Sequence, residues 1–144
     1  MRKILLCSLI AVVAAGAAFA ESASIAERKA LFKEMGKASG PVGAMLQGKA
    51  PFDLAPVQAA LTLYVDHAGK LKELFPDDSK EGGKTEAKAE IWANKAEFTA
   101  LFDKFAADST AAGKSIVDEA SFKAEMGKVF GNCGTCHEKF KAKS

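Results

Sequence analysis

Residues 133–137 carry the strongest chemical motif of the chain. They read Cys-Gly-Thr-Cys-His, a C-x-x-C-H pattern that is typical of covalent c-type haem attachment. Side chains three residues apart lie on nearly the same face of a helix, so the thiols of Cys133 and Cys136 can both reach the two vinyl groups of one porphyrin. The adjacent imidazole of His137 can then bind the iron. The motif predicts one covalent haem c per chain, with His137 as the metal ligand.

Three other interpretations compete with haem attachment. A C-x-x-C pair can form a redox disulfide, but that use belongs near a βαβ pattern, which the sequence does not show. The pair can be half of a zinc site, but His67 is the only other histidine and no second cysteine pair exists, so tetrahedral coordination lacks donors. The third interpretation is chance, and three fixed positions in a short chain argue against it.

The N-terminal residues predict a secretory signal peptide. A basic start is followed by an apolar run over 4–19, and we expect cleavage after Ala20. The run is short for a transmembrane helix, and no later stretch could span a bilayer. We therefore expect an exported, periplasmic protein in which residues 21–144 form one domain. Cys7 lies inside the signal, and the two cysteines that remain are too few for a disulfide scaffold.

Net charge excludes one class of partner. The full chain has 20 basic and 18 acidic residues, and Arg2 and Lys3 leave with the signal. The exported domain is then close to neutral. A nucleic-acid binder needs a basic surplus to neutralise phosphates, so we expect no nucleic-acid partner.

The composition after the signal predicts an all-α fold. It is rich in Ala, Lys, Glu and Leu and poor in β-branched residues, which favours helix. The first helix should begin near Ser24, because Ser24 and Glu27 fit a capping box. Gly40-Pro41 should bend or interrupt it, since proline removes a donor and clashes with the preceding turn. Residues 48–51 should end it.

Three further helices follow. Residues that cap or break helices mark them: Asp53 and Pro76 for the second, Thr85 and Gly113 for the third after a loop over 77–84, and Asp118 for the start of the fourth. Each segment has one apolar stripe at spacings of three and four. Four amphipathic helices with mostly short connections bury such stripes together in an antiparallel four-helix bundle, with the haem on the last helix.

The place of the motif resembles the class II cytochromes c. In those proteins C-x-x-C-H lies near the C-terminus, on the last of four helices, and the resemblance is closest to cytochrome c′. It covers the whole exported chain. The matching segments are Arg28-Lys29 with Phe32 one turn later, Phe52-Asp53, Ile91-Trp92, and the run from Gly131-Asn132-Cys133 to Phe140.

The resemblance assigns the distal face of the haem to the first helix. Low-spin members of the class place a methionine four residues after the basic residue, whereas members of the cytochrome c′ kind place a non-ligating residue there. That position is Phe32, which implies five-coordinate, high-spin iron under a hydrophobic cover. Such a site binds small gases such as NO and CO, with electron transfer to redox partner proteins as a further use. We expect no enzymatic activity.

Two other functions stay open. One is a low-spin, six-coordinate electron carrier in which Met35 or another group is the sixth ligand. The other is a weak peroxidase-like activity of the open iron. Phe32 discriminates the gas-binding protein from the electron carrier, because Phe32→Met should become low-spin if Phe32 occupies the distal position.

The resemblance also implies secondary roles. Arg28 would hydrogen-bond a haem propionate, Trp92 would pack against the haem or its neighbours, and Lys141 would lie beside the proximal face, where the family usually has arginine. A homodimer through the first two helices is implied as well. His67 is expected to be a surface residue and Tyr64 a core or interface residue.

Overall fold

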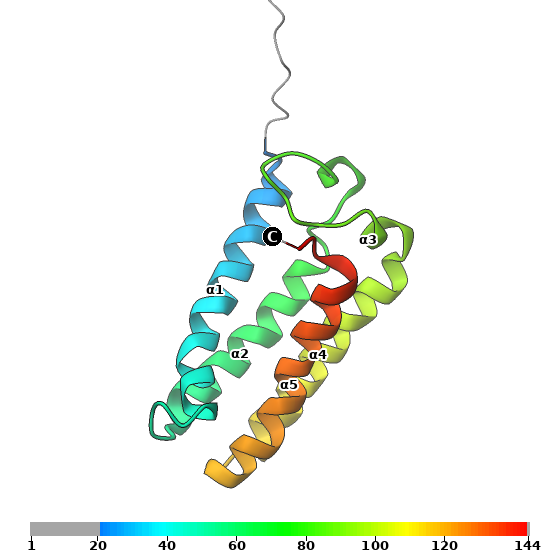
Figure 1. Ribbon diagram of the computed structural model, residues 1–144. Coiled ribbons are helices and arrows are strands. Elements are labelled where there is room, and N and C mark those ends of the chain that lie inside the picture. Colours follow the sequence, from blue (N-terminus) through cyan, green and yellow to red (C-terminus); the bar gives the residue numbers. More distant parts are fainter. Residues whose placement is uncertain (1–20, 144) are drawn as a thin grey trace, which may run out of the picture.

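The structure is a computed structural model that describes residues 21–143. Four long helices make up most of this part of the chain: α1 (Ala23–Leu46), α2 (Leu54–Leu71), α4 (Lys95–Ser115) and α5 (Glu119–Phe140). A 3-10 turn, η1 (Asp77–Ser79), and a one-turn helix, α3 (Glu90–Ala93), lie between α2 and α4. The long helices alternate in direction along the bundle (Figure 1). The predicted antiparallel four-helix bundle is confirmed, and the predicted signal peptide over 1–20 lies outside the described residues.

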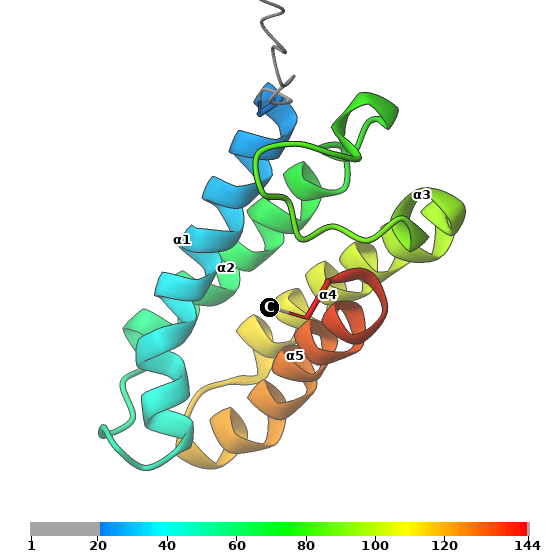
Figure 2. The same ribbon diagram turned by 45° about the horizontal axis from the view of Figure 1, so that its top comes forward.

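The helices pack as two neighbouring pairs. α1 packs on α2, α5 packs on α4, and α2 and α4 join the pairs through the most extensive contact in the bundle. α1 and α5 make few contacts with each other, and Figure 2 shows their ribbons well apart. Within residues 21–143, no helix is both long and apolar enough to cross a membrane.

Local capping chemistry sets the starts of three helices. Asp53 caps α2 by accepting a hydrogen bond from the Ala55 N–H at 3.0 Å, as predicted. Asp118 caps α5, also as predicted, in a capping box with Ser121. The predicted start of the first helix at Ser24 is wrong by two residues. Ser22 has the extended backbone of an N-cap, and its hydroxyl accepts from the Ile25 N–H at 3.3 Å.

Gly40-Pro41 was predicted to bend or interrupt the first helix, and Pro41 does not interrupt it. α1 continues through it to Leu46. The ring is exposed on the solvent side of the helix, while the next residue, Val42, is fully buried. Packing of the buried side of α1 therefore outweighs the loss of one backbone hydrogen bond at the exposed side.

The prediction that Thr85 caps the third helix is wrong. The connection continues to Ala89, α3 is one turn long, and the chain breaks at Asn94 before α4 begins at Lys95. The Thr85 hydroxyl is not available as a cap, because it bonds Arg28 of α1 instead. Residues 86–88 pair with the end of α5, which keeps them extended.

The core is formed by buried apolar side chains from all four long helices, with aromatic rings at its centre. Phe98 of α4 lies edge-on to Phe75, Phe102 and Phe140, at ring-centroid distances of 4.7, 5.1 and 5.2 Å. His67 corrects a prediction, because it is buried rather than at the surface. Its Nε2 lies 2.8 Å from Glu34 of α1, a partner that the sequence of α2 alone could not reveal.

Candidate functional site

A cavity of about 760 Å³ opens between α1 and α5 and is lined mainly by apolar side chains. This volume lies within the range of about 300–1,000 Å³ that is usual for ligand and cofactor sites. Its wall includes six of the seven residues predicted for the site: Arg28, Phe32, Cys133, Cys136, His137 and Lys141. The structure therefore brings residues from the two ends of the sequence into one site.

The C-x-x-C-H motif lies on the last two turns of α5. Both thiols are free and half-buried, and both line the cavity. Burial raises the pKa of the Cys133 thiol, and it raises the pKa of the Cys136 thiol to about 11. Reactive redox cysteines have lowered pKa values, so this environment opposes the interpretation as a redox disulfide. Partial burial, together with Lys141, lowers the pKa of His137, which favours the neutral imidazole that metals bind.

The zinc interpretation also lacks donors in the folded chain. Within residues 21–143, no three His, Cys, Asp or Glu side chains gather where they could hold a metal ion. His67 faces Glu34 and Asp66 rather than the cysteine pair.

Phe32 and Met35 of α1 both line the cavity. The Phe32 ring is 38% exposed, and its centroid lies 6.5 Å from that of Phe102. Met35 is half-buried one turn later. The residue expected to cover the distal face and the residue considered as an alternative ligand therefore share this wall.

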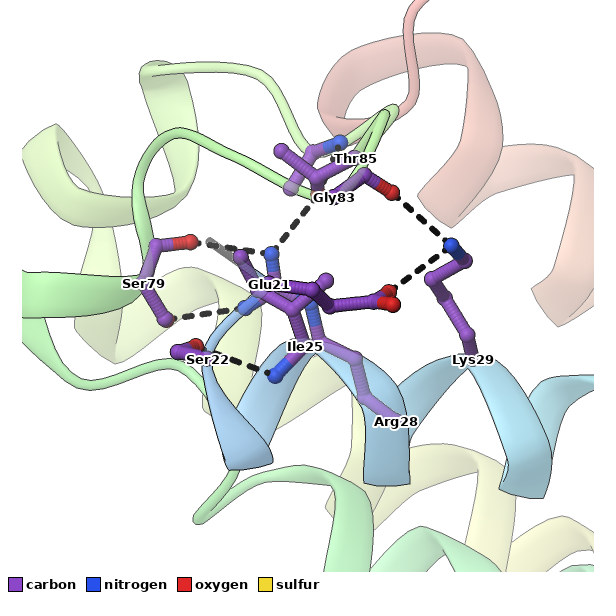
Figure 3. A network of polar contacts seen from close by, with 9 residues as sticks. Glu21, Ser22, Ile25, Arg28, Lys29, Ser79, Gly83 and Thr85 are labelled. Carbon is purple, nitrogen blue, oxygen red and sulfur yellow. Dashed lines mark hydrogen bonds and ion pairs between the residues drawn. The ribbon is translucent and has the colours of Figure 1, made fainter. Parts of the chain in front are cut away.

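Arg28 is almost fully buried and is bound to the connection between α2 and α3 (Figure 3). One Nη donates to the Leu74 carbonyl at 3.1 Å and to Ser79 Oγ at 2.8 Å. The other donates to the Ser79 carbonyl at 3.0 Å and to Thr85 Oγ1 at 2.7 Å. The guanidinium also lies 4.4 Å from the centroid of the Phe75 ring. The family resemblance implied a propionate ligand, and the sequence did not reveal this structural network.

Trp92 does not line the cavity, unlike the other predicted site residues. Its indole N–H donates to the carbonyls of Phe75 and Pro76, at 3.1 Å each. Its ring lies edge-on to Phe75, with the centroids 6.2 Å apart. The indole therefore holds the residues that follow α2. One of them, Phe75, lines the cavity.

The C-terminal end of α5 is held by the same connection. Lys141 pairs with Glu86 at 3.0 Å, and an antiparallel bridge joins Ala87 to Lys141. Lys141 was predicted from the family pattern, but Glu86 was missed. No short-range sequence signal links the two, because they are far apart in the chain.

Tyr64 also contributes to the cavity wall. It is buried, as expected, and its hydroxyl lies 2.7 Å from Ser39 Oγ. Burial raises the pKa of this phenol.

An apolar cavity with two thiols and an imidazole along one wall fits a haem with two thioether bonds and one histidine ligand.

A family model described as Cytochrome C′ matches residues 23–141, which include every helix that the structure describes and all residues that line the cavity. The chain belongs to the cytochrome c′ family. Members of this family bind covalent haem c, and so does this protein. Its neighbours in fold are the haem-bearing four-helix bundles of the family.

Individual relatives agree over nearly the full chain. The cytochrome c′ of Rhodopseudomonas palustris is 51% identical, over 93% of this chain and 92% of its own length. A solved structure of that protein superposes with a TM-score of 0.84 and covers 85% of this chain and 98% of its own. Cytochrome c-556 of the same organism is 33% identical, over 92% of this chain and 91% of its own length.

One more distant structure is a nitric oxide complex. It is a mutant cytochrome c′ from Alcaligenes xylosoxidans, 24% identical, with a TM-score of 0.70, and it covers 83% of this chain and 94% of its own. At this identity the likeness shows the shared fold alone.

Proposed function

We propose that this protein is a periplasmic, gas-binding haem protein with a five-coordinate, high-spin iron. Cys133 and Cys136 would carry the two thioether bonds, and His137 would be the axial ligand. The observation that carries the proposal is that Phe32 of α1 lines the same cavity as the C-x-x-C-H motif of α5. Phenylalanine has no lone pair for a metal, so a ring at this position leaves the sixth coordination site open.

The cavity wall supports small uncharged gases as the ligands. A bound haem supplies the iron site at which NO or CO binds. The surrounding phenylalanines make entry of water or ions unfavourable, because a polar group would lose its hydration without gaining a hydrogen bond. Among the residues that line the cavity, the only histidine is His137. No distal acid–base pair stands out in this wall for peroxide cleavage, so we do not propose an enzyme.

An electron carrier with six-coordinate, low-spin iron is the second candidate. Met35 lines the cavity, and a thioether is a good ligand for haem iron. The relatives of this chain include cytochromes c-556 as well as cytochromes c′. The two candidates differ in the state of the iron, which can be measured directly.

Optical spectra of the purified ferric and ferrous protein, with and without CO, decide between them. We expect high-spin bands and ready CO binding. A low-spin spectrum that ignores CO would exclude the open site and favour the electron carrier.

Phe32→Met tests the position of the distal residue. The new thioether should bind the iron, convert the spectrum to low spin and weaken CO binding. Leu31→Met is the matched control, because Leu31 neighbours Phe32 on α1 but does not line the cavity. A Phe32→Met protein that stays high-spin would contradict the assignment.

We further propose a homodimer through α1 and α2. Cβ atoms added at Gly40 or Gly43 of α1 would meet nothing within 4 Å in the monomer, and neither glycine lines the cavity, which leaves this side of α1 accessible to a second copy. Val65 of α2 is 36% exposed. Sedimentation of the haem-loaded protein should give the mass of two chains, and a single-chain mass would refute the dimer.

A further inference from the structure

Thr85 joins two parts of the structure that are distant in sequence. Its hydroxyl oxygen accepts a hydrogen bond from Arg28 of α1 at 2.7 Å and another from the Ala87 N–H at 3.3 Å. Figure 3 shows the first of these bonds, with Arg28 reaching from α1 to the connection between α2 and α3. Arg28 also donates to Leu74 and Ser79, so the same guanidinium holds three residues of this connection.

The residues just after Thr85 hold the last turn of α5. The Lys88 N–H donates to the Phe140 carbonyl at 3.0 Å, and the Ala142 N–H donates to the Glu86 carbonyl at 2.8 Å. The Glu86 carboxylate also pairs with Lys141. These contacts occupy groups that the end of a helix would otherwise leave to water.

The same turn of α5 contains His137. The Lys141 N–H donates to the His137 carbonyl at 3.1 Å, which closes the turn. Lys141 is also the bridge partner of Ala87. Hydrogen bonds, together with the backbone of residues 86–88 and 140–142, therefore connect Arg28 through Thr85 to the backbone of His137.

We propose that Thr85 is a positioning residue for His137. Its hydroxyl fixes residues 86–88 relative to α1, and these residues fix the direction in which the last turn of α5 presents the imidazole. The proposal rests on the proposed role of His137 as axial ligand. It links α1, which carries Phe32, to the turn that carries His137, so the two sides of the haem are held by one set of contacts.

Substitution of Thr85 tests the link. Thr85→Val keeps the shape of the side chain but removes the acceptor, so it leaves an Arg28 N–H unpaired in a buried place. Thr85→Ser keeps the hydroxyl and should behave as the wild type. Thr110→Val is the matched control, because the Thr110 hydroxyl bonds only its own helix, at the Ala106 carbonyl, on an exposed face.

Two readouts are made on the haem-loaded protein. The first is amide hydrogen exchange at Lys88 and Ala142, which we expect to accelerate about tenfold in Thr85→Val, as for the loss of one hydrogen bond. The second is the iron–histidine stretching band of the ferrous protein by resonance Raman spectroscopy. We expect this band to shift in Thr85→Val and to stay unchanged in Thr85→Ser and Thr110→Val. If exchange accelerates but the band does not move, Thr85 stabilises the connection without orienting His137, and the proposal is wrong.

Failure of the proposed function would be seen separately. A six-coordinate iron would appear in the optical spectrum of the wild type, and the reduction potential would then replace the stretching band in the same comparison. If Thr85→Val does not fold, Thr85→Ala gives a second test, because it also removes the hydroxyl and its smaller side chain leaves room for water to reach Arg28. Thr85→Ala should shift the same band, and an unshifted band would overturn the proposal.

Discussion

Arg28 and Lys29 are adjacent cations with opposite surroundings. Arg28 is 2% exposed and makes four hydrogen bonds to residues of the α2 connection. The Lys29 side chain is 50% exposed and pairs with Glu21 and the Gly83 carbonyl. A buried charge loses its solvation and depends on its partners, whereas an exposed ion pair contributes little to stability.

Truncation of each side chain should therefore have different effects on folding. We expect Arg28→Ala to lower the free energy of unfolding by about 3 kcal/mol or more, because four acceptors lose a charged donor. We expect Lys29→Ala to lower it by less than about 1 kcal/mol. Denaturant unfolding of the two haem-loaded variants measures the difference. Equal losses would mean that the Arg28 network does not hold the connection.

At the scale of the helix, Pro41 is the residue of α1 with the lowest helix propensity. It lies inside the helix, where proline costs up to about 3 kcal/mol relative to alanine. Pro56 lies in the first turn of α2, where the missing N–H has no intrahelical partner in any case. The two prolines thus provide a matched pair.

Pro41→Ala should stabilise the protein by about 1–3 kcal/mol, and Pro56→Ala should change its stability very little. The midpoint of thermal unfolding of each variant measures this. No gain from Pro41→Ala would mean that packing around α1 already compensates fully for the lost hydrogen bond.

The helices also show which features a sequence can predict. Asp53 and Asp118 were found as caps because their partners lie two or three residues away. The haem motif was found because its chemistry is contained in five adjacent residues. Thr85 and His67 were misassigned because their deciding partners, Arg28 and Glu34, belong to another helix. Arg28 was placed in the site from family resemblance, but its buried network follows only from the folded connection.

At the scale of the whole molecule, the cavity takes the place of part of a hydrophobic core. Its apolar lining faces about 760 Å³ of space that no side chain of the bundle fills, and unfilled apolar surface lowers stability. The net stability of a domain is only about 5–15 kcal/mol, so we expect the haem to supply a substantial part of it.

A chain without haem should not keep this cavity open. We expect the Cys133→Ser, Cys136→Ser double variant, produced without haem, to retain helical far-ultraviolet circular dichroism and lose near-ultraviolet signals, as in a molten globule. Cooperative thermal unfolding at the temperature of the haem-loaded protein would contradict this expectation.

The position of Trp92 gives the molecule a built-in optical reporter. It is the single tryptophan of the chain, and its indole is bonded to Phe75 and Pro76, next to the cavity-lining Ile91. A haem in the cavity would accept its excitation energy, so emission of the folded protein should be almost dark. When the bundle opens, the haem stays tethered to α5 and Trp92 moves away from it. The appearance of fluorescence would then time the separation of α3 from α5, without any added label.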